Sequence, residues 1–263
     1  MNRLAALFWA PRGGGETPTT ARIAGWLAAF LLTALLFTYA FQQLEYRWGW
    51  DSVYAYRRKF VDGWLVTLAI SALSLLTSLL IGLFFALAQK SRFLPLRYFS
   101  KLYIELIRGT PLLVQILVFF YVVADAFGVS NRYLVGVLTL SLFAGAYICE
   151  IIRAGIESVG ESQLESARAI GLTRAQIYRH VVFPQAFRRI LPPLAGQFAS
   201  LIKDSSLLSI IAVSEFTLNA QEVNAFTFST LESYLPLALG YLALTLPISL
   251  LSRRLELRYL YAT

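Results

Sequence analysis

The sequence predicts an all-α integral membrane protein with six transmembrane helices. Only 14% of its 263 residues are charged, whereas a soluble domain has about 25%, and its mean hydropathy is positive. Three stretches contain no Asp, Glu, Lys or Arg: Ile23–Leu44, Trp64–Gln89 and Ser233–Ser252. Each reaches the roughly 20 residues that a helix needs to cross the hydrocarbon layer. These observations exclude a soluble globular domain.

We place the six spans at residues 23–43, 62–89, 102–126, 133–156, 188–212 and 233–252. The segments that would then share a side with the two termini hold sixteen Lys and Arg residues, and the opposite segments hold five. Because Lys and Arg accumulate in cytoplasmic loops, we expect both termini in the cytoplasm. The exception is the basic cluster Arg57, Arg58 and Lys59 on the outer side, which with its neighbouring Trp and Tyr residues indicates a short interfacial helix.

Two residue counts limit the chemistry that the chain can perform. Cys149 is the only cysteine and lies in an apolar run, so we expect a buried thiol and no disulfide framework. His180 is the only histidine, so no two-histidine metal site can form within one chain. The net charge of +8 is explained by basic cytoplasmic loops, without a nucleic-acid partner.

The second span carries small residues at four-residue intervals. Ser74, Ser78, Gly82 and Ala86 therefore lie along one face of the predicted helix. Small side chains allow a second membrane helix to approach closely, so this face is predicted to be a helix-packing surface.

One long polar segment, Glu165–Phe187, lies between apolar runs and carries strong local folding signals. Gly171 suits the left-handed end of a helix. Thr173 is positioned as an N-cap with Gln176 as its capping-box partner, and Leu172 and Ile177 occupy the positions of a hydrophobic staple.

Further signals flank this turn. Ser162 and Glu165 have the spacing of a second capping box, and Pro184 disfavours helix at the residue before it. We therefore expect two short helices meeting at a tight turn on the cytoplasmic face. Short helices need packing to persist, so the segment is either a structured loop or a docking element for a cytoplasmic protein.

The same segment resembles the EAA loop of ABC importer permeases. Glu165-Ser-Ala167, Gly171, Val181 and Phe183-Pro184 keep the spacing of that loop, with Ser166, Val181 and Phe183 as mild departures. More of the chain resembles the polar amino acid subfamily (histidine, glutamine and arginine type). The matching blocks are IELIRGTPLLVQ (104–115), AYICEIIRAGIESV (146–159), residues 164–193 and LIKDSSLLSIIAVSEFT (201–217).

The resemblance implies a five-span type I ABC permease core at residues 61–252. It would be preceded by a cytoplasmic leader, 1–22, and an extra span with an outer linker, 23–60, and followed by a cytoplasmic tail, 253–263. It further implies a multi-pass permease subunit of a bacterial inner-membrane importer for polar amino acids. Such a subunit pairs with a second permease, as a homodimer or a heterodimer. A periplasmic or lipid-anchored solute-binding protein delivers the amino acid, whose identity the resemblance leaves open.

The resemblance also implies that loop 158–185 holds a cytoplasmic coupling helix seated on an ABC ATPase subunit, which binds ATP and Mg. The implied coupling residues are Ser162, Glu165, Ala167, Gly171, Thr173 and Pro184. Independently, no lysine of this chain follows a glycine, as a phosphate-binding loop requires. We therefore expect no enzymatic activity in this chain and no cofactor bound to it.

Ionisable residues within the spans form three groups. Glu105 with Arg108, and Glu150 with Arg153, are spaced i, i+3, which allows an ion pair on one helix face, and we interpret both as structural. A charge in the bilayer costs roughly 2.5–3.5 kcal/mol, so such residues face the bundle interior or pair.

The third group is Lys203 and Asp204, beside Ser205 and Ser206. A zwitterionic amino acid needs a cation for its carboxylate and an anion for its amine, and this group offers both. We interpret it as a candidate substrate pathway or gate; a structural ion pair is the alternative.

The predicted outer loop 213–232 contains acidic residues and no Lys or Arg. Glu215, Glu222 and Glu232 would either meet a basic patch on a delivery protein or form a solvated acidic loop.

Two other functions remain open on the sequence. A secondary transporter driven by an ion gradient would work without an ATPase. An intramembrane enzyme would need a nucleophile with a positioned base or a metal cluster, which a single histidine disfavours.

Overall fold

The computed structural model describes residues 18–43 and 46–260, and every regular element within them is helical. The chain forms two compact units, Met1–Trp48 and Gly49–Thr263. In its described part the first unit is α2, Thr19–Gln42, which has no buried residue and is long and apolar enough to cross a membrane. Most of the predicted leader, residues 1–17, lies outside the described residues.

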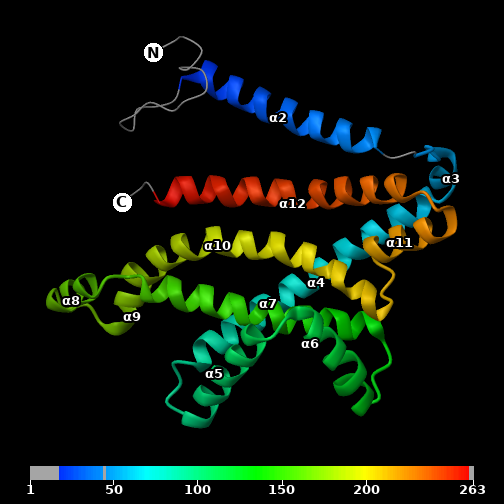
Figure 1. Cartoon of the computed structure of the whole chain (residues 1–263). Helices are drawn as coiled ribbons and strands as arrows, with labels where there is room; N and C mark the ends of the chain where they lie inside the picture. Colours follow the sequence, from blue (N-terminus) through cyan, green and yellow to red (C-terminus); the bar gives the residue numbers. More distant parts are fainter. Residues whose placement is uncertain (1–17, 44–45, 261–263) are drawn as a thin grey trace. The chain divides into compact units, whose positions relative to one another are not determined.

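The second unit is built around four long helices, α4, α7, α10 and α12, which can be followed in Figure 1. α4 packs along α7, and α10 packs against both α7 and α12. Its elements are α3 (Trp50–Ala55), α4 (Arg57–Ala88), α5 (Leu94–Gly109), α6 (Leu112–Val118), the π-helix η1 (Phe119–Ala124), α7 (Arg132–Glu157), α8 (Glu161–Ala169), α9 (Arg174–Ile177), the π-helix η2 (Tyr178–Val182), α10 (Phe183–Asp204), the 3₁₀-helix η3 (Ser205–Ile211), α11 (Phe216–Thr227) and α12 (Thr230–Leu260).

The small-residue face of α4 is the surface that contacts α7, which confirms the predicted packing. Ser74, Ser78, Gly82 and Ala86 are all buried. A Cβ atom added at Gly82 would lie 2.6 Å from Cγ2 of Ile148 on α7, closer than real Cβ contacts occur. The absence of a side chain therefore sets how closely the two helices approach.

The predicted third span, 102–126, is not a single helix. α5 and the α6–η1 pair are bent by 111° at a break around Thr110 and Pro111. Proline disfavours helix at the residue before it and cannot donate a backbone hydrogen bond. Gln115 Nε2 donates to the carbonyls of Ile107 and Thr110, at 2.6 and 3.0 Å, and so satisfies groups that the break leaves free.

The fifth predicted span, 188–212, is also irregular. α10 ends at Asp204 and the chain continues as the 3₁₀-helix η3. Within the described residues, only α2, α4, α7 and α12 are long and apolar enough to cross a membrane alone, and the bent α5–η1 pair would be a fifth span. α10 is not long and apolar enough to count as a span, because it is strongly amphipathic and carries Arg188 and Arg189 in its first half and Lys203 and Asp204 at its end. The prediction of six spans is therefore not confirmed, although the all-helical membrane class is.

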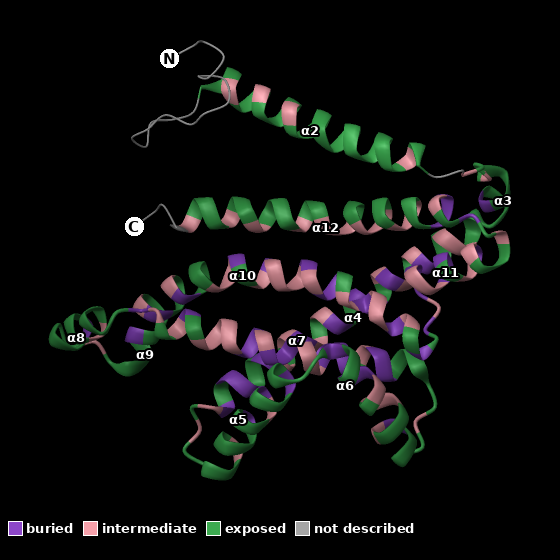
Figure 2. Ribbon diagram, in the orientation of Figure 1, coloured by how far each residue is buried: buried purple, intermediate pink, exposed green. Residues whose placement is uncertain are grey.

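Apolar burial is concentrated on a few helices. Figure 2 shows buried residues gathered on α4, α7 and α11, whereas α8 and most of α12 are exposed. The largest cluster joins Leu112 and Ile116 of α6 to Leu140 of α7 and Leu208 of η3. Cys149 is buried, as predicted, and accepts a hydrogen bond from Gln89 at 3.3 Å. The apolar faces left exposed on long helices suit contact with lipid.

The expected short helix near the basic cluster is present as α3, but the cluster itself lies elsewhere. Arg57, Arg58 and Lys59 form the first turn of α4. Lys59 forms an ion pair with Glu222 of α11, so part of this cluster serves contacts within the fold.

Candidate functional site

The segment between α7 and α10, residues 161–182, contains α8, α9 and η2, and is called the α8–η2 segment below. It lies at one end of the α7–α10 pair (Figure 1). A small apolar cluster of Val159, Ala167, Ile177 and Val182 packs it against the end of α7. Most of its other side chains are exposed. The segment is therefore fixed on one face and open on the other.

The turn at Gly171 confirms the left-handed helix end that the sequence predicts. Gly171 has φ +82°, a conformation that favours glycine. The Leu172 N–H bonds to the Ala167 carbonyl at 3.1 Å, and the Gly171 N–H bonds to the Arg168 carbonyl at 3.0 Å. These two bonds are a Schellman motif, which satisfies the last carbonyls of α8.

The start of α9 is also confirmed. Thr173 Oγ1 accepts from the Gln176 N–H at 3.4 Å, and Gln176 Oε1 accepts from the Thr173 N–H at 2.8 Å, which together form a capping box. Leu172 and Ile177 belong to the same apolar cluster, as a hydrophobic staple requires. The turn between α8 and α9 is thus held by its own backbone and caps.

Two predictions on this segment are wrong. The box at Ser162 and Glu165 does not form, because α8 begins one residue before Ser162 with Gly160 as its N-cap. Pro184 does not end the second helix. It lies in the first turn of α10, where its missing N–H is tolerated, and the π-helix η2 joins α9 to α10. The second helix is therefore continuous with α10 and not short.

Two hollows flank the α8–η2 segment. One, of about 590 Å³, is lined by charged residues from α7, α8 and α9, including Glu157, Arg168 and Arg174. The other, of about 460 Å³, is lined mostly by small, polar and apolar groups of α8 and of the region that follows it, including Ser166 and Ala167. Between α8 and α9, Ile170 is 77% exposed. The open face of the segment thus combines an exposed apolar side chain with two hollows, one lined by charged groups and one by small, polar and apolar groups.

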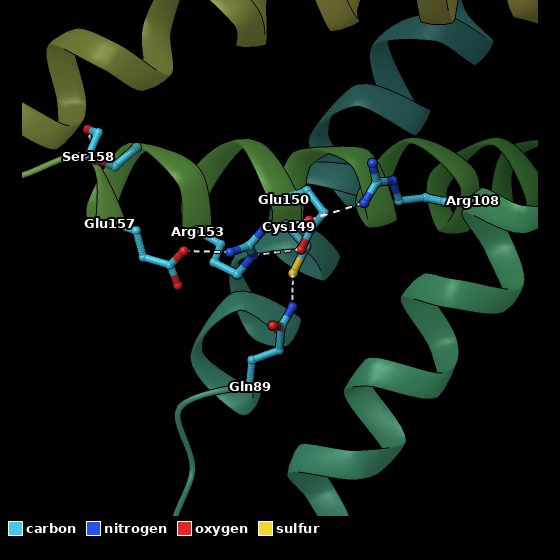
Figure 3. A network of polar contacts seen from close by, with 8 residues as sticks. Gln89, Arg108, Cys149, Glu150, Arg153, Glu157 and Ser158 are labelled. Atoms are coloured by element: carbon cyan, nitrogen blue, oxygen red, sulfur yellow. Dashed lines mark hydrogen bonds and ion pairs between the residues drawn. The ribbon is translucent and has the colours of Figure 1, made fainter.

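A ladder of ion pairs follows one face of α7 toward this segment (Figure 3). The predicted pair of Glu150 and Arg153 is confirmed: both carboxylate oxygens of Glu150 accept from Arg153, each at 2.9 Å. Arg153 also bonds to Glu157. We call Glu150, Arg153 and Glu157 the α7 ladder.

The second predicted pair, Glu105 with Arg108, is wrong. Arg108 Nη1 instead donates to Glu150 Oε2 at 3.1 Å, from α5 to α7. None of the ion pairs in the described part of the chain involves Glu105, which lines a cavity of about 740 Å³. The i, i+3 spacing permits a pair of Glu105 with Arg108 within α5. Arg108 instead reaches across to the Glu150 carboxylate of α7, which can accept hydrogen bonds from two guanidinium groups at once.

The candidate pathway group lies where α10 passes into η3. Lys203 is exposed and Asp204 is half-buried, and neither belongs to an ion pair among the described residues. Ser205 and Ser206 direct their hydroxyls to the carbonyls of Ile202 and Lys203, at 2.7 and 2.6 Å. The two serines therefore support the change of helix type, and the two charges are left free of protein ion pairs.

Sequence reasoning missed an internal network around α11. Glu215 is fully buried and caps α11, accepting the N–H groups of Thr217 and Leu218 at 2.8 and 2.9 Å. Tyr241 of α12 donates to the same carboxylate at 2.9 Å, and Thr67 of α4 donates to it at 3.4 Å. Burial raises the pKa of Glu215, and the hydrogen bonds that it accepts oppose this shift only in part.

This network corrects the expectation of an acidic outer loop. Glu232 is also fully buried and accepts the Gly49 N–H, and Glu222 pairs with Lys59. The three carboxylates are therefore neither a solvated loop nor a free acidic patch. Negative side chains are favoured near a helix N-terminus, which is the signal that could have suggested this role for Glu215.

Fold and site together define a multi-pass helical membrane subunit with an exposed, self-capped segment between two of its helices. The chain belongs to the family described as the binding-protein-dependent transport system inner membrane component, which matches residues 78–261. The matched region begins within α4, so α2 lies outside it.

Relatives and solved structures agree with this family. The probable glutamine ABC transporter permease protein GlnM of Bacillus subtilis is 36% identical over 204 residues, which are 76% of this chain and 94% of the relative. The L-cystine transport system permease protein TcyB of the same organism is 40% identical over 194 residues, 73% of this chain and 82% of the relative. The crystal structure of an amino acid ABC transporter with histidines is 36% identical and has a TM-score of 0.75, covering 81% of this chain and all of that one.

Proposed function

We propose that this chain is the membrane-spanning permease subunit of an ATP-driven importer for a polar amino acid. The observation that carries this proposal is the α8–η2 segment, which keeps the EAA spacing and presents an exposed face on a fixed base. The names of the relatives support the solute class, since they specify a glutamine ABC transporter, an L-cystine transport system and an amino acid ABC transporter with histidines. They differ in solute, so the proposal is limited to the class.

The α8–η2 segment would couple the permease to a separate ABC ATPase subunit that binds ATP and Mg. Ala167 fixes the segment from beneath, and Gly171 and Thr173 shape its turn. Ile170 and Glu165 on the open face would enter the partner's groove. Ser162 lies on the exposed first turn of α8, and Pro184 on the first turn of α10 that receives the motion.

The charge distribution supports the orientation of this subunit. With the six spans placed as the sequence predicts, sixteen Lys and Arg residues fall on the side of the α8–η2 segment and five on the other, which favours cytoplasmic termini. The remaining partners would be a second permease subunit, identical or different, and a periplasmic or lipid-anchored solute-binding protein; the words binding-protein-dependent in the family description support the second of these. Lys203 and Asp204 would meet the zwitterionic solute along the pathway.

Cross-linking and uptake together test this proposal. In a Cys149→Ala background, a thiol at Ser166 should cross-link to the ATPase subunit, whereas a thiol at the exposed Ser130, in the loop before α7, should not. Vesicles holding the full complex should take up amino acid only with ATP and should continue after ionophores collapse the ion gradients. Uptake that needs an ion gradient and no ATPase would instead establish a secondary transporter.

A further inference from the structure

Glu150 holds an unusual position between two irregular parts of the molecule. It accepts hydrogen bonds from Arg108 on α5 and from Arg153 on its own helix. Figure 3 shows its carboxylate between these two guanidinium groups. The Glu150 side chain is only about one fifth exposed, and because Arg153 also pairs with Glu157 the connected groups hold two positive and two negative charges.

On one side, Glu150 connects to the α8–η2 segment through the last turns of α7. Arg153 joins Glu150 to Glu157, and these three ladder residues follow the i, i+3 and i+4 spacing of one helix face. Val159 then belongs to the apolar cluster of the segment. Arg189 of α10 donates to the Ser158 carbonyl at 3.0 Å. These contacts form a continuous connection between the segment and α7.

On the other side, Glu150 connects to the broken span. Arg108 is the next-to-last residue of α5, directly before the break around Thr110 and Pro111. Other contacts hold α5 earlier in the helix, from Tyr103 to the Leu142 carbonyl and from Ser100 to the Phe85 carbonyl. The pair of Arg108 and Glu150 is therefore the polar side-chain contact between α5 and α7 that lies nearest the bend.

We propose that Glu150 is a positioning residue that transmits movement of the α8–η2 segment to the bend between α5 and α6, and so couples ATP hydrolysis to transport. This inference rests on the proposed function. A carboxylate is required because it offers acceptor sites to both arginines, whereas an amide would present N–H groups to one of them. Tyr103 and Ser100 keep α5 attached when the pair is lost, so coupling fails while the fold remains.

The test is Glu150→Gln in the complete complex reconstituted into vesicles, with ATP hydrolysis and amino acid uptake measured in the same sample. Hydrolysis should stay within about twofold of wild type, and uptake per ATP should fall about tenfold, the loss expected for one charge-assisted hydrogen bond. Glu222→Gln, which removes the interhelical partner of Lys59, is the matched control and should leave uptake per ATP unchanged.

The double variant tests whether the two residues act as a unit. Arg108→Gln should reproduce the loss, and Arg108→Gln with Glu150→Gln should be no worse than either alone. If Glu150→Gln does not assemble, the exposed Arg108→Gln decides the question by itself. Equal loss of hydrolysis and uptake, or additive losses in the double variant, would overturn the role of Glu150. Wild-type vesicles without ATP-dependent uptake would overturn the proposed function instead.

Discussion

The two ends of the helical bundle satisfy their polar groups in opposite ways. In the α8–η2 segment the caps and turn bonds join residues at most five positions apart, such as Thr173 with Gln176. In the network around α11, which we call the α11 cluster, Glu215 caps its own helix, but other bonds join residues far apart in the chain. Thr67 reaches Glu215 across 148 positions, and Gly49 reaches Glu232 across 183. One end is folded locally, and the other is locked by tertiary contacts.

This difference suggests how one subunit would combine the proposed docking surface with a stable frame. The α8–η2 segment satisfies the polar groups of its caps and turn locally and packs one apolar face on the end of α7, so its outer face remains available to a partner. A cluster that joins α4, α11 and α12 through one buried carboxylate fixes those helices relative to each other. We therefore expect substitutions in the α8–η2 segment to affect coupling, and substitutions in the α11 cluster to affect stability.

The same substitution at each end gives the largest contrast. Glu215→Ala removes the acceptor of two backbone N–H groups and two hydroxyls, and should cost about 3–5 kcal/mol of unfolding free energy, because buried donors are left unpaired. Glu165→Ala, on the exposed face of α8, should change stability by less than about 0.5 kcal/mol.

Thermal unfolding of both variants in detergent measures this contrast, and ATP-dependent uptake gives the second readout. Glu165→Ala should retain the wild-type unfolding temperature and lose uptake, whereas Glu215→Ala should lose both. Equal unfolding temperatures for the two variants would show that the α11 cluster does not act as a lock.

The pKa of Glu215 predicts how the α11 cluster responds to pH. Burial raises this pKa, so the folded protein holds the proton more tightly than the unfolded chain does. The resulting stability is fully present below the ordinary carboxyl pKa and is lost as the pH rises through the raised value. The loss can reach about 1.4 kcal/mol per pH unit within that window.

Glu215→Gln isolates this effect because it keeps an acceptor oxygen and cannot ionise. Unfolding temperatures measured from pH 4 to pH 8 should fall for wild type relative to the variant as the pH rises. A wild-type curve parallel to that of Glu215→Gln would show that the pKa of this carboxyl is not raised by folding.

The contrast between the two ends also explains what the sequence could predict. The sequence predicts the turn at Gly171 and the capping box of Thr173 with Gln176 correctly. The partners of these residues lie only a few positions away, where spacing determines geometry. The prediction that Glu215 and Glu232 lie in an exposed loop is wrong. Their burial depends on partners from α4, α12 and the chain before α3, which spacing along the sequence does not show.

The same reason applies to the charges within the spans. Spacing alone allows Glu105 to pair with Arg108, but the choice of Glu150 depends on how α5 crosses α7. The long uncharged runs predict α2, α4 and α12 well. The break in the third span was signalled by Pro111, but its 111° bend depends on Gln115 and on packing against α7 and η3.

A smaller effect is expected at the turn of the α8–η2 segment. Gly171→Ala places a Cβ in a left-handed conformation, which costs roughly 1–2 kcal/mol, although no atom stands within 4 Å of the added group. Gly196→Ala, in the middle of α10, also meets open space but has ordinary helical backbone, so it should be stabilising by up to about 1 kcal/mol. Hydrogen exchange of the backbone amides at positions 171 and 172 should become faster in Gly171→Ala and stay unchanged in Gly196→Ala.

The smallest effect is expected at the cap of α9. Thr173→Ala removes the acceptor of the Gln176 N–H and should reduce the stability of the α8–η2 segment by about 1 kcal/mol. The loss should be confined to this segment, because the hydrogen bonds of its caps and turn join residues within it. Thr173→Ser keeps the hydroxyl and is the matched control. The alanine variant should weaken cross-linking of Ser166→Cys to the ATPase subunit and leave the unfolding temperature of the bundle unchanged. A lower unfolding temperature with normal cross-linking would mean that the α8–η2 segment is part of the frame, and the distinction between the two ends would not hold.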